Sequence, residues 1–129
     1  MYKFLWIAAG GAIGAILRYL FVGYICRTLV GDFPWGTLLV NIIGCLVIDI
    51  LWAITNRFPF SLQIDVFLFT GVLGAFTAFS TYGLESIKLL QQGEIVLGLT
   101  YIAVSNMVGL LAVLLGKGTI DGLLTALNL

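Results

Sequence analysis

The side chains that could do chemistry are mostly neutral hydrogen-bond donors inside long apolar segments. Thr37 and Asn41 are four residues apart, and Ser80, Thr81 and Tyr82 are consecutive. Hydroxyl and amide groups donate hydrogen bonds without carrying a charge. They can therefore meet a small anion without holding it as tightly as a fixed cation would, and weak sites of this kind suit conduction. The donor set favours an anion pathway over a catalytic site.

Aromatic rings and further hydroxyl groups add to this set. Phe76 and Phe79 lie beside the serine and threonine of the third apolar segment, and the edge of an aromatic ring carries positive electrostatic potential. Tyr101 and Ser105 are four residues apart in the fourth segment, so they share one helix face. We expect these side chains to extend the same pathway.

Two charged side chains lie within the apolar segments, where charge is costly and usually functional. Arg18 lies late in the first segment, where a cation near the mouth of a pathway would attract anions. Asp49 lies in the second segment. It indicates either a proton or cation pathway or a structural ion pair, and the sequence leaves both interpretations open.

The composition excludes most other classes of protein. Of the 129 residues, 61% are apolar and 9% are charged, whereas about 25% is typical of a soluble domain. Histidine is absent, which removes the commonest general base and metal ligand, and no nucleophile–base pair is evident. No basic run is present to bind nucleic acid. Cys26 and Cys45 lack paired metal or redox spacing, so we expect buried free thiols.

Four apolar segments are each long enough to cross a bilayer, for which about 20 residues are needed. Their approximate ranges are 4–26, 35–55, 66–88 and 95–116. The connecting loops are short, so we expect residues 1–129 to form a single four-helix membrane domain. The sequence therefore predicts an all-α integral membrane protein with four transmembrane helices per subunit.

The basic residues near the helix ends are almost evenly divided between the two sides of the membrane. One side would hold Lys3, Arg57 and Lys117, and the other Arg27 and Lys88. Because lysine and arginine normally mark the cytoplasmic side, this near-balance has two interpretations. One is a weakly biased single topology, and the other is dual insertion followed by assembly of an antiparallel dimer.

Small and hydroxyl residues indicate where the helices pack closely and where one is interrupted. Gly10 and Gly14 share a face of the first helix and predict a packing seam. Between Thr70 and Gly83 lie three glycines, three threonines and one serine, with these two ends included. Such residues weaken a helix, and non-helical backbone at membrane depth lines a protected or wet cavity. We therefore expect the third helix to be broken in mid-membrane.

Three segments of the chain together resemble one known family. Residues 10–18 (GGAIGAILR), 35–44 (WGTLLVNIIG) and 74–82 (GAFTAFSTY) are similar to signature segments of the Fluc (CrcB) fluoride channels. The similarity extends over almost the whole chain, including its length and its four apolar segments.

This resemblance implies an antiparallel, dual-topology homodimer with two pores in the lipid bilayer. Such a dimer would export cytoplasmic fluoride passively, relieving its toxicity, as a multi-pass protein of the cell inner (plasma) membrane. A structural sodium ion would lie at the dimer interface, held by the main-chain carbonyls of Gly74 and Thr77. The fluoride-pathway positions that match the family, or resemble its polar track, are Arg18, Asn41, Phe79, Ser80, Thr81, Tyr82, Tyr101 and Ser105. Tyr82 stands where the family usually has a second phenylalanine.

Two alternatives belong to other classes. Small multidrug exporters also have four helices and dual topology, but they exchange protons through a carboxylate in the first helix. The first apolar segment here contains Arg18 and no acid, and Asp49 lies in the second. A non-catalytic assembly subunit is the other alternative, and the polar third segment argues against it.

Overall fold

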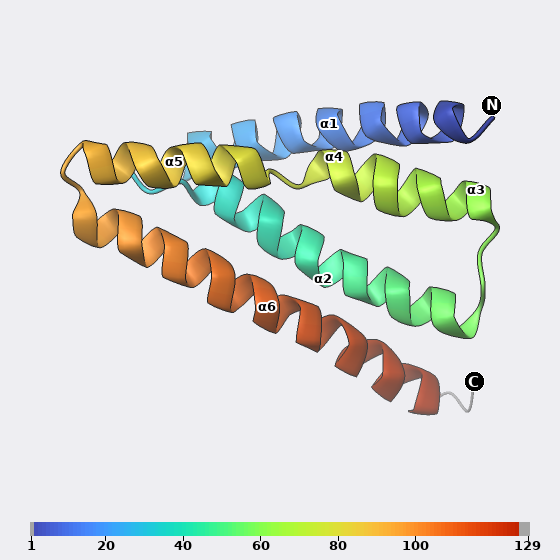
Figure 1. The fold of residues 1–129 in the computed structure, drawn as a ribbon. Helices are drawn as coiled ribbons and strands as arrows, with labels where there is room; N and C mark the ends of the chain where they lie inside the picture. Colours follow the sequence, from blue (N-terminus) through green and yellow to red (C-terminus); the bar gives the residue numbers. More distant parts are fainter. Residues whose placement is uncertain (1, 127–129) are drawn as a thin grey trace.

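The computed structural model describes residues 2–126, without the side chains at positions 117, 121, 123 and 124. Within that range it contains helices and no strand. Their order is α1 (Tyr2–Thr28), α2 (Trp35–Arg57), α3 (Leu62–Asp65), the π-helix η1 (Val66–Leu73), α4 (Gly74–Phe76), α5 (Phe79–Gln91) and α6 (Ile95–Ala126). Figure 1 shows this arrangement.

Four helical stretches are long and apolar enough to cross a membrane. They are Tyr2–Thr28, Trp35–Arg57, Leu62–Gln91 and Ile95–Ile120. A helix satisfies its own backbone hydrogen bonds, which is the requirement that lipid imposes on a chain without a closed barrel. The prediction of an all-α, multi-pass membrane protein with four such helices is confirmed.

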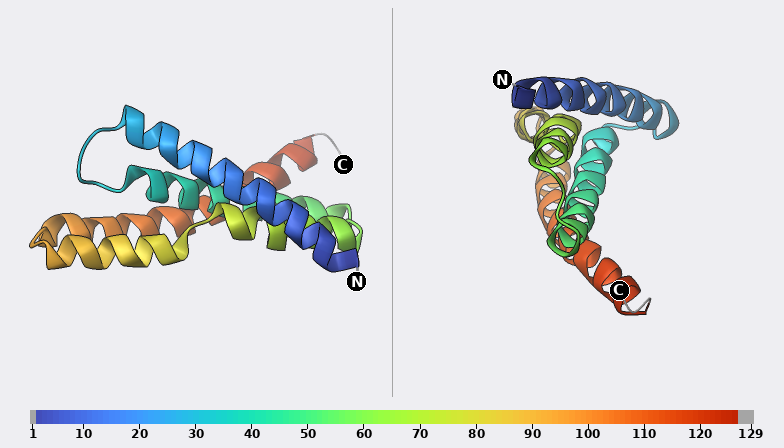
Figure 2. Two further views of the ribbon diagram at one scale, coloured as in Figure 1. Left: turned by 90° about the horizontal axis from the view of Figure 1, so that it is seen from above. Right: turned by 90° about the vertical axis from the view of Figure 1, so that its right-hand side faces the viewer.

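The helices alternate in direction, so both described ends of the chain lie at one end of the bundle. The α2–α3 connection lies at that end as well, and the other two connections lie at the opposite end (Figure 1). In the connection between α5 and α6, Gly93 has a φ of 84°, which suits glycine. Viewed along the bundle, α1 and α6 lie on opposite sides of the remaining helices (Figure 2).

The closest helix contacts are made at glycines. A Cβ placed on Gly14 of α1 would collide with the carbonyl oxygen of Val72 in η1, and one on Gly10 would collide with that of Phe67. On α6, a Cβ at Gly116 would lie 2.8 Å from the carbonyl oxygen of Leu46. The predicted glycine seam of α1 is confirmed as a packing surface.

Helical geometry is interrupted between α4 and α5. Thr77 is extended, with φ −73° and ψ 157°, and Ala78 has φ −137° and ψ 59°. Neither residue belongs to a helix, and α5 begins at Phe79 (Figure 1). This interruption positions most of the candidate site described next.

Candidate ion pathway

Asn41 of α2 holds the interrupted backbone through a side-chain hydrogen bond. Its Oδ1 accepts from the backbone N–H of Ala78 at 2.7 Å. In a continuous α-helix that N–H would donate to the carbonyl oxygen of Gly74, four residues earlier. The Gly74 carbonyl is therefore released from its usual helical partner, and the two amide hydrogens of Asn41 remain for other acceptors.

Arg18 of α1 reaches the same interruption from the other side. Its Nη1 donates to the carbonyl oxygen of Thr77 at 3.1 Å. The Thr77 hydroxyl is turned back onto its own helix, where it donates to the carbonyl oxygen of Leu73 at 3.1 Å. A cation therefore already lies against one of the two carbonyls at which the family resemblance implies a sodium ion.

A cavity of about 300 Å³ opens beside the interruption, between α2, α5 and α6. Among the described residues that line it, none carries a charge. They are Asn41, Cys45, Thr77, Phe79, Tyr82, Ser105, Asn106, Gly109 and Leu110. Four residues predicted for the pathway therefore meet here: Asn41, Phe79, Tyr82 and Ser105.

The polar atoms of this cavity are only partly engaged. The Oγ of Ser105 is buried and has no hydrogen-bond partner among the described residues. The Nδ2 of Asn106 donates to the Tyr82 hydroxyl at 2.8 Å and to the carbonyl oxygen of Ile102 at 2.7 Å. Because Tyr82 accepts from Asn106, its own hydrogen remains available to donate. Sequence reasoning missed Asn106, whose position directly after Ser105 was the available signal.

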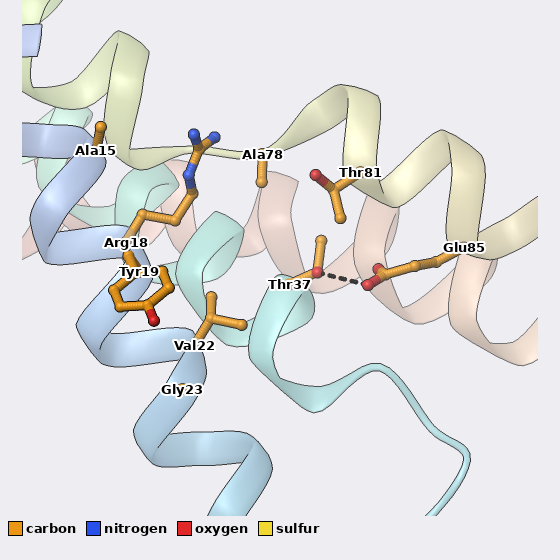
Figure 3. A pocket seen from close by; sticks show the side chains of 9 residues that line it. All are labelled: Ala15, Arg18, Tyr19, Val22, Gly23, Thr37, Ala78, Thr81 and Glu85. Carbon is orange, nitrogen blue, oxygen red and sulfur yellow. Dashed lines mark hydrogen bonds between the residues drawn. The ribbon is translucent and has the colours of Figure 1, made fainter.

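A second and larger cavity, of about 560 Å³, lies on the other side of the interruption, between α1, α2 and α5. Arg18, Thr37, Thr81 and Glu85 provide its polar groups. Figure 3 shows Arg18 reaching toward the Ala78 backbone from α1, with Thr81 and Glu85 following along α5. The cavity therefore carries a cation near the interruption and an anion farther from it.

The Glu85 carboxylate is held by two hydroxyl donors. Thr37 Oγ1 donates to Oε1 at 3.0 Å, as drawn in Figure 3, and the Tyr101 hydroxyl donates to Oε2 at 2.9 Å. The Tyr101 side chain is fully buried. Its hydroxyl is thus committed to Glu85. Sequence reasoning used Glu85 only as the end of an apolar segment and missed this role, because both donors come from other helices.

Three consecutive predicted residues at the start of α5 are exposed in the single subunit. Phe79 is 79% exposed, and Ser80 and Thr81 are exposed as well. The Phe79 ring lies 5.6 Å from the Tyr82 ring, and the Tyr82 ring 5.4 Å from that of Tyr101, both as centroid distances. A row of rings therefore runs from the surface of the subunit to its interior. Ser80 lines neither of the two cavities described above.

Two further expectations concern Asp49 and the two cysteines. Asp49 lies where α6 packs on α2, with its Cβ 3.0 Å from the position that a Cβ on Gly116 would occupy. Its Oδ2 is buried without a hydrogen-bond partner among the described residues. Cys26 and Cys45 are both free thiols, but the predicted burial is wrong for Cys26, which is exposed, while Cys45 is partly buried.

These observations define a class: multi-pass helical membrane proteins whose interrupted third segment borders an uncharged polar cavity. Within that class the chain belongs to the CrcB family, since residues 5–117 match the family described as "CrcB-like protein, Camphor Resistance (CrcB)".

Individual relatives support the same membership. The chain is 45% identical over 118 residues to a protein of Salinibacter ruber, covering 92% of this chain and 89% of the relative. It is 46% identical to a protein of Rhizobium etli, with 90% and 94% covered, and 43% identical to one of Helicobacter pylori strain G27, with 89% and 90% covered. Each relative is named "Fluoride-specific ion channel FluC".

Proposed function

We propose that this protein is a fluoride-specific ion channel. The observation that carries the proposal is the uncharged cavity beside the Asn41–Ala78 hydrogen bond, lined by amide, hydroxyl and aromatic groups. Fluoride is small and strongly hydrated, so a pathway must replace its water shell with closely placed donors. The names of the relatives point to the same ion and to a channel rather than an enzyme.

In this proposal the two cavities are successive parts of one pathway. Arg18 attracts the anion to the larger cavity. Asn41 Nδ2, the Tyr82 hydroxyl and the Ser105 hydroxyl then donate to it in the smaller one. The ring edge of Phe79 adds positive potential without a full charge. Thr81 contributes a hydroxyl group to the larger cavity, and Ser80 contributes one at the exposed surface of α5. Tyr101 contributes indirectly, by holding the Glu85 carboxylate.

We further propose an antiparallel, dual-topology homodimer with two pores. Phe79 is 79% exposed although it belongs to the aromatic row of the pathway, and a second copy packed against α5 would enclose it. Exposing the hydroxyl groups of Ser80 and Thr81 on α5 to lipid would cost free energy. Packing these residues between two copies would cover the interruption with protein. Non-helical backbone at membrane depth is tolerated where protein covers it.

A structural sodium ion at the dimer interface is part of the proposal. The Gly74 carbonyl lacks its usual helical donor because Ala78 N–H bonds to Asn41, and the Thr77 carbonyl lies outside any helix. Main-chain carbonyls are suitable ligands for a hard cation. These two groups therefore fit a sodium ion, which would compete with Arg18 for the Thr77 carbonyl oxygen. The ion would supply a fixed positive charge at that interface.

The whole chain, residues 1–129, is proposed to act as a single four-helix domain in the cell inner (plasma) membrane. There it would export cytoplasmic fluoride passively and relieve its toxicity. The alternative, a proton-coupled multidrug exporter, requires a carboxylate in the first helix, and α1 carries none. Glu85, the carboxylate that lines the larger cavity, is held by two hydroxyl donors.

The deciding experiment is ion efflux from liposomes containing the purified protein. We expect fluoride to leave down its gradient, with chloride leaving very much more slowly and with no requirement for a proton gradient. Empty liposomes provide the baseline. Equal efflux of the two anions would contradict fluoride specificity, and efflux only against counter-transported protons would favour the exporter.

A further inference from the structure

A third cavity lies away from the proposed pathway, between the last turns of α2 and the start of η1. Its volume is about 210 Å³, and it is lined by Trp52, Thr55, Asp65, Val66, Phe69 and Thr70. It shares no lining residue with either cavity of the pathway. The cavity is therefore spatially distinct from both.

Two residues that line this cavity, from different helices, carry a buried side-chain oxygen without a hydrogen-bond partner among the described residues. These oxygens are Oδ1 of Asp65 and Oγ1 of Thr55. Removing a polar group from water without replacing its hydrogen bonds is costly, and for a carboxylate the cost is larger. The pair is therefore set up to receive a group that donates hydrogen bonds and carries positive charge.

The other lining residues indicate which kind of cation fits. Trp52 and Phe69 bring aromatic rings, which attract organic cations. A bound metal ion would need about six oxygen ligands, and the described residues contain no group of three or more histidine, cysteine, aspartate or glutamate side chains suited to a metal. One carboxylate, hydroxyl oxygens and aromatic rings together suit a primary ammonium group.

The position of the cavity indicates where the ammonium group comes from. Thr55 is two residues from Arg57, the exposed last residue of α2, and Asp65 ends the short helix that opens the next membrane-crossing stretch. Trp52 is 57% exposed. Tryptophan and arginine near helix ends are typical of the boundary between lipid and water. Lipid headgroups lie at this boundary.

We propose that this cavity binds the primary ammonium of a phospholipid headgroup, as in phosphatidylethanolamine. The ammonium pairs with Asp65 Oδ1 and donates to Thr55 Oγ1. Trp52 and Phe69 pack against the headgroup. A headgroup whose nitrogen is fully methylated has no N–H to donate, so phosphatidylcholine leaves both oxygens without a partner.

Lipid binding can be tested on the delipidated, full-length protein by native mass spectrometry, which counts lipid adducts on each subunit. We expect phosphatidylethanolamine to bind about tenfold more tightly than phosphatidylcholine with the same acyl chains, the factor associated with a charge-assisted hydrogen bond. Asp65→Asn should abolish this preference. Thr55→Val, which has nearly the same shape, should reduce it. Glu94→Gln removes the same charge from an exposed loop residue at the opposite end of the bundle and should leave the preference intact.

Other results would overturn the proposal. Equal binding of the two lipids, or an unchanged preference in Asp65→Asn, would show that the cavity does not bind the ammonium group of the lipid. If soluble ethanolamine competed as well as the lipid did at equal concentration, the site would recognise a free amine. If sodium chloride, but not N-methylglucamine chloride, raised the unfolding temperature only when Asp65 is present, the occupant would be an inorganic cation.

Discussion

The Oδ1 atom of Asn41 takes the place of a helical carbonyl, because it accepts the N–H of Ala78 at 2.7 Å. This single bond has two consequences. It satisfies a backbone donor that the interruption would leave unpaired, and it fixes the orientation of the amide, so that Nδ2 is the group left for the cavity. The residue that stabilises the interruption is thus also the residue that presents donors beside it.

Replacing Asn41 by aspartate tests this orientation. The carboxylate keeps an oxygen to accept from Ala78 but places a negative charge where the donors were. We expect fluoride efflux from liposomes to fall about tenfold or more, as expected for the loss of one charge-assisted hydrogen bond in the pathway. Asn56→Asp changes an exposed residue of the same helix and should retain normal efflux. Normal efflux in Asn41→Asp would show that the amide does not contact the ion.

Phe79→Ile tests the exposed ring. Isoleucine keeps apolar bulk but removes the positively polarised edge. We expect a correctly folded protein whose fluoride efflux is severely reduced. The matched control is Phe58→Ile, which alters a half-exposed ring in the α2–α3 connection. If Phe79→Ile conducted like the unmodified protein, the ring would serve packing alone.

Gly14 and Gly11, three residues apart on α1, make a matched pair for testing the α1 seam. A Cβ at Gly14 meets the backbone oxygen of Val72, which cannot move aside, whereas a Cβ at Gly11 meets nothing within 4 Å. We expect Gly14→Ala to lower the free energy of unfolding in detergent by about 1–3 kcal/mol, the usual cost of overpacking. Gly11→Ala should leave it nearly unchanged. Equal effects of the two changes would show that α1 does not dock on η1 through this seam.

Much of the fold could be predicted because lipid allows few alternatives. A run of apolar residues in a chain with so little charge must form its own hydrogen bonds, so the number of helices follows from hydropathy. The contact made by Gly10 and Gly14 could also be predicted, since small residues four apart share one helix face.

The partners of individual polar groups could not be predicted in the same way. Which residues leave the helix depends on Asn41, which accepts a hydrogen bond from the N–H of Ala78, 37 positions away in the sequence. Glu85 looks like a solvated charge at the end of a segment until folding brings Thr37 and Tyr101 to it from two other helices. Such contacts depend on how the helices pack, which neither periodicity nor composition encodes.

The Tyr101–Glu85 hydrogen bond can be measured with a double-mutant cycle. Tyr101→Phe leaves one carboxylate oxygen of Glu85 without its donor, and we expect a loss of about 1–3 kcal/mol in unfolding free energy. Combining it with Glu85→Gln should cost less than the sum of the two single changes, since the shared interaction is lost only once. Tyr24→Phe, on an exposed tyrosine of α1, is the control. Strictly additive effects would mean that the two groups do not interact.

Arg18 and the proposed sodium ion compete for one carbonyl oxygen. The guanidinium donates to Thr77 O at 3.1 Å, and two cations beside the same oxygen repel each other. Sodium binding must therefore displace Arg18 or work against its charge. Arg18→Gln removes this competition, so we expect the variant to be stabilised at a lower sodium concentration than the unmodified protein.

The measurement is the unfolding temperature in detergent as sodium chloride replaces N-methylglucamine chloride at constant ionic strength. A ligand that binds only the folded state raises this temperature once its concentration exceeds the dissociation constant, and the rise then grows with the logarithm of the concentration. The sodium concentration at which this temperature begins to rise should fall severalfold in Arg18→Gln and stay unchanged in Arg18→Lys, because lysine keeps the positive charge beside the carbonyl. Arg27→Gln, exposed at the end of α1, controls for net charge. If Arg18→Gln instead required more sodium, Arg18 would be holding Thr77 in place for the ion rather than competing with it.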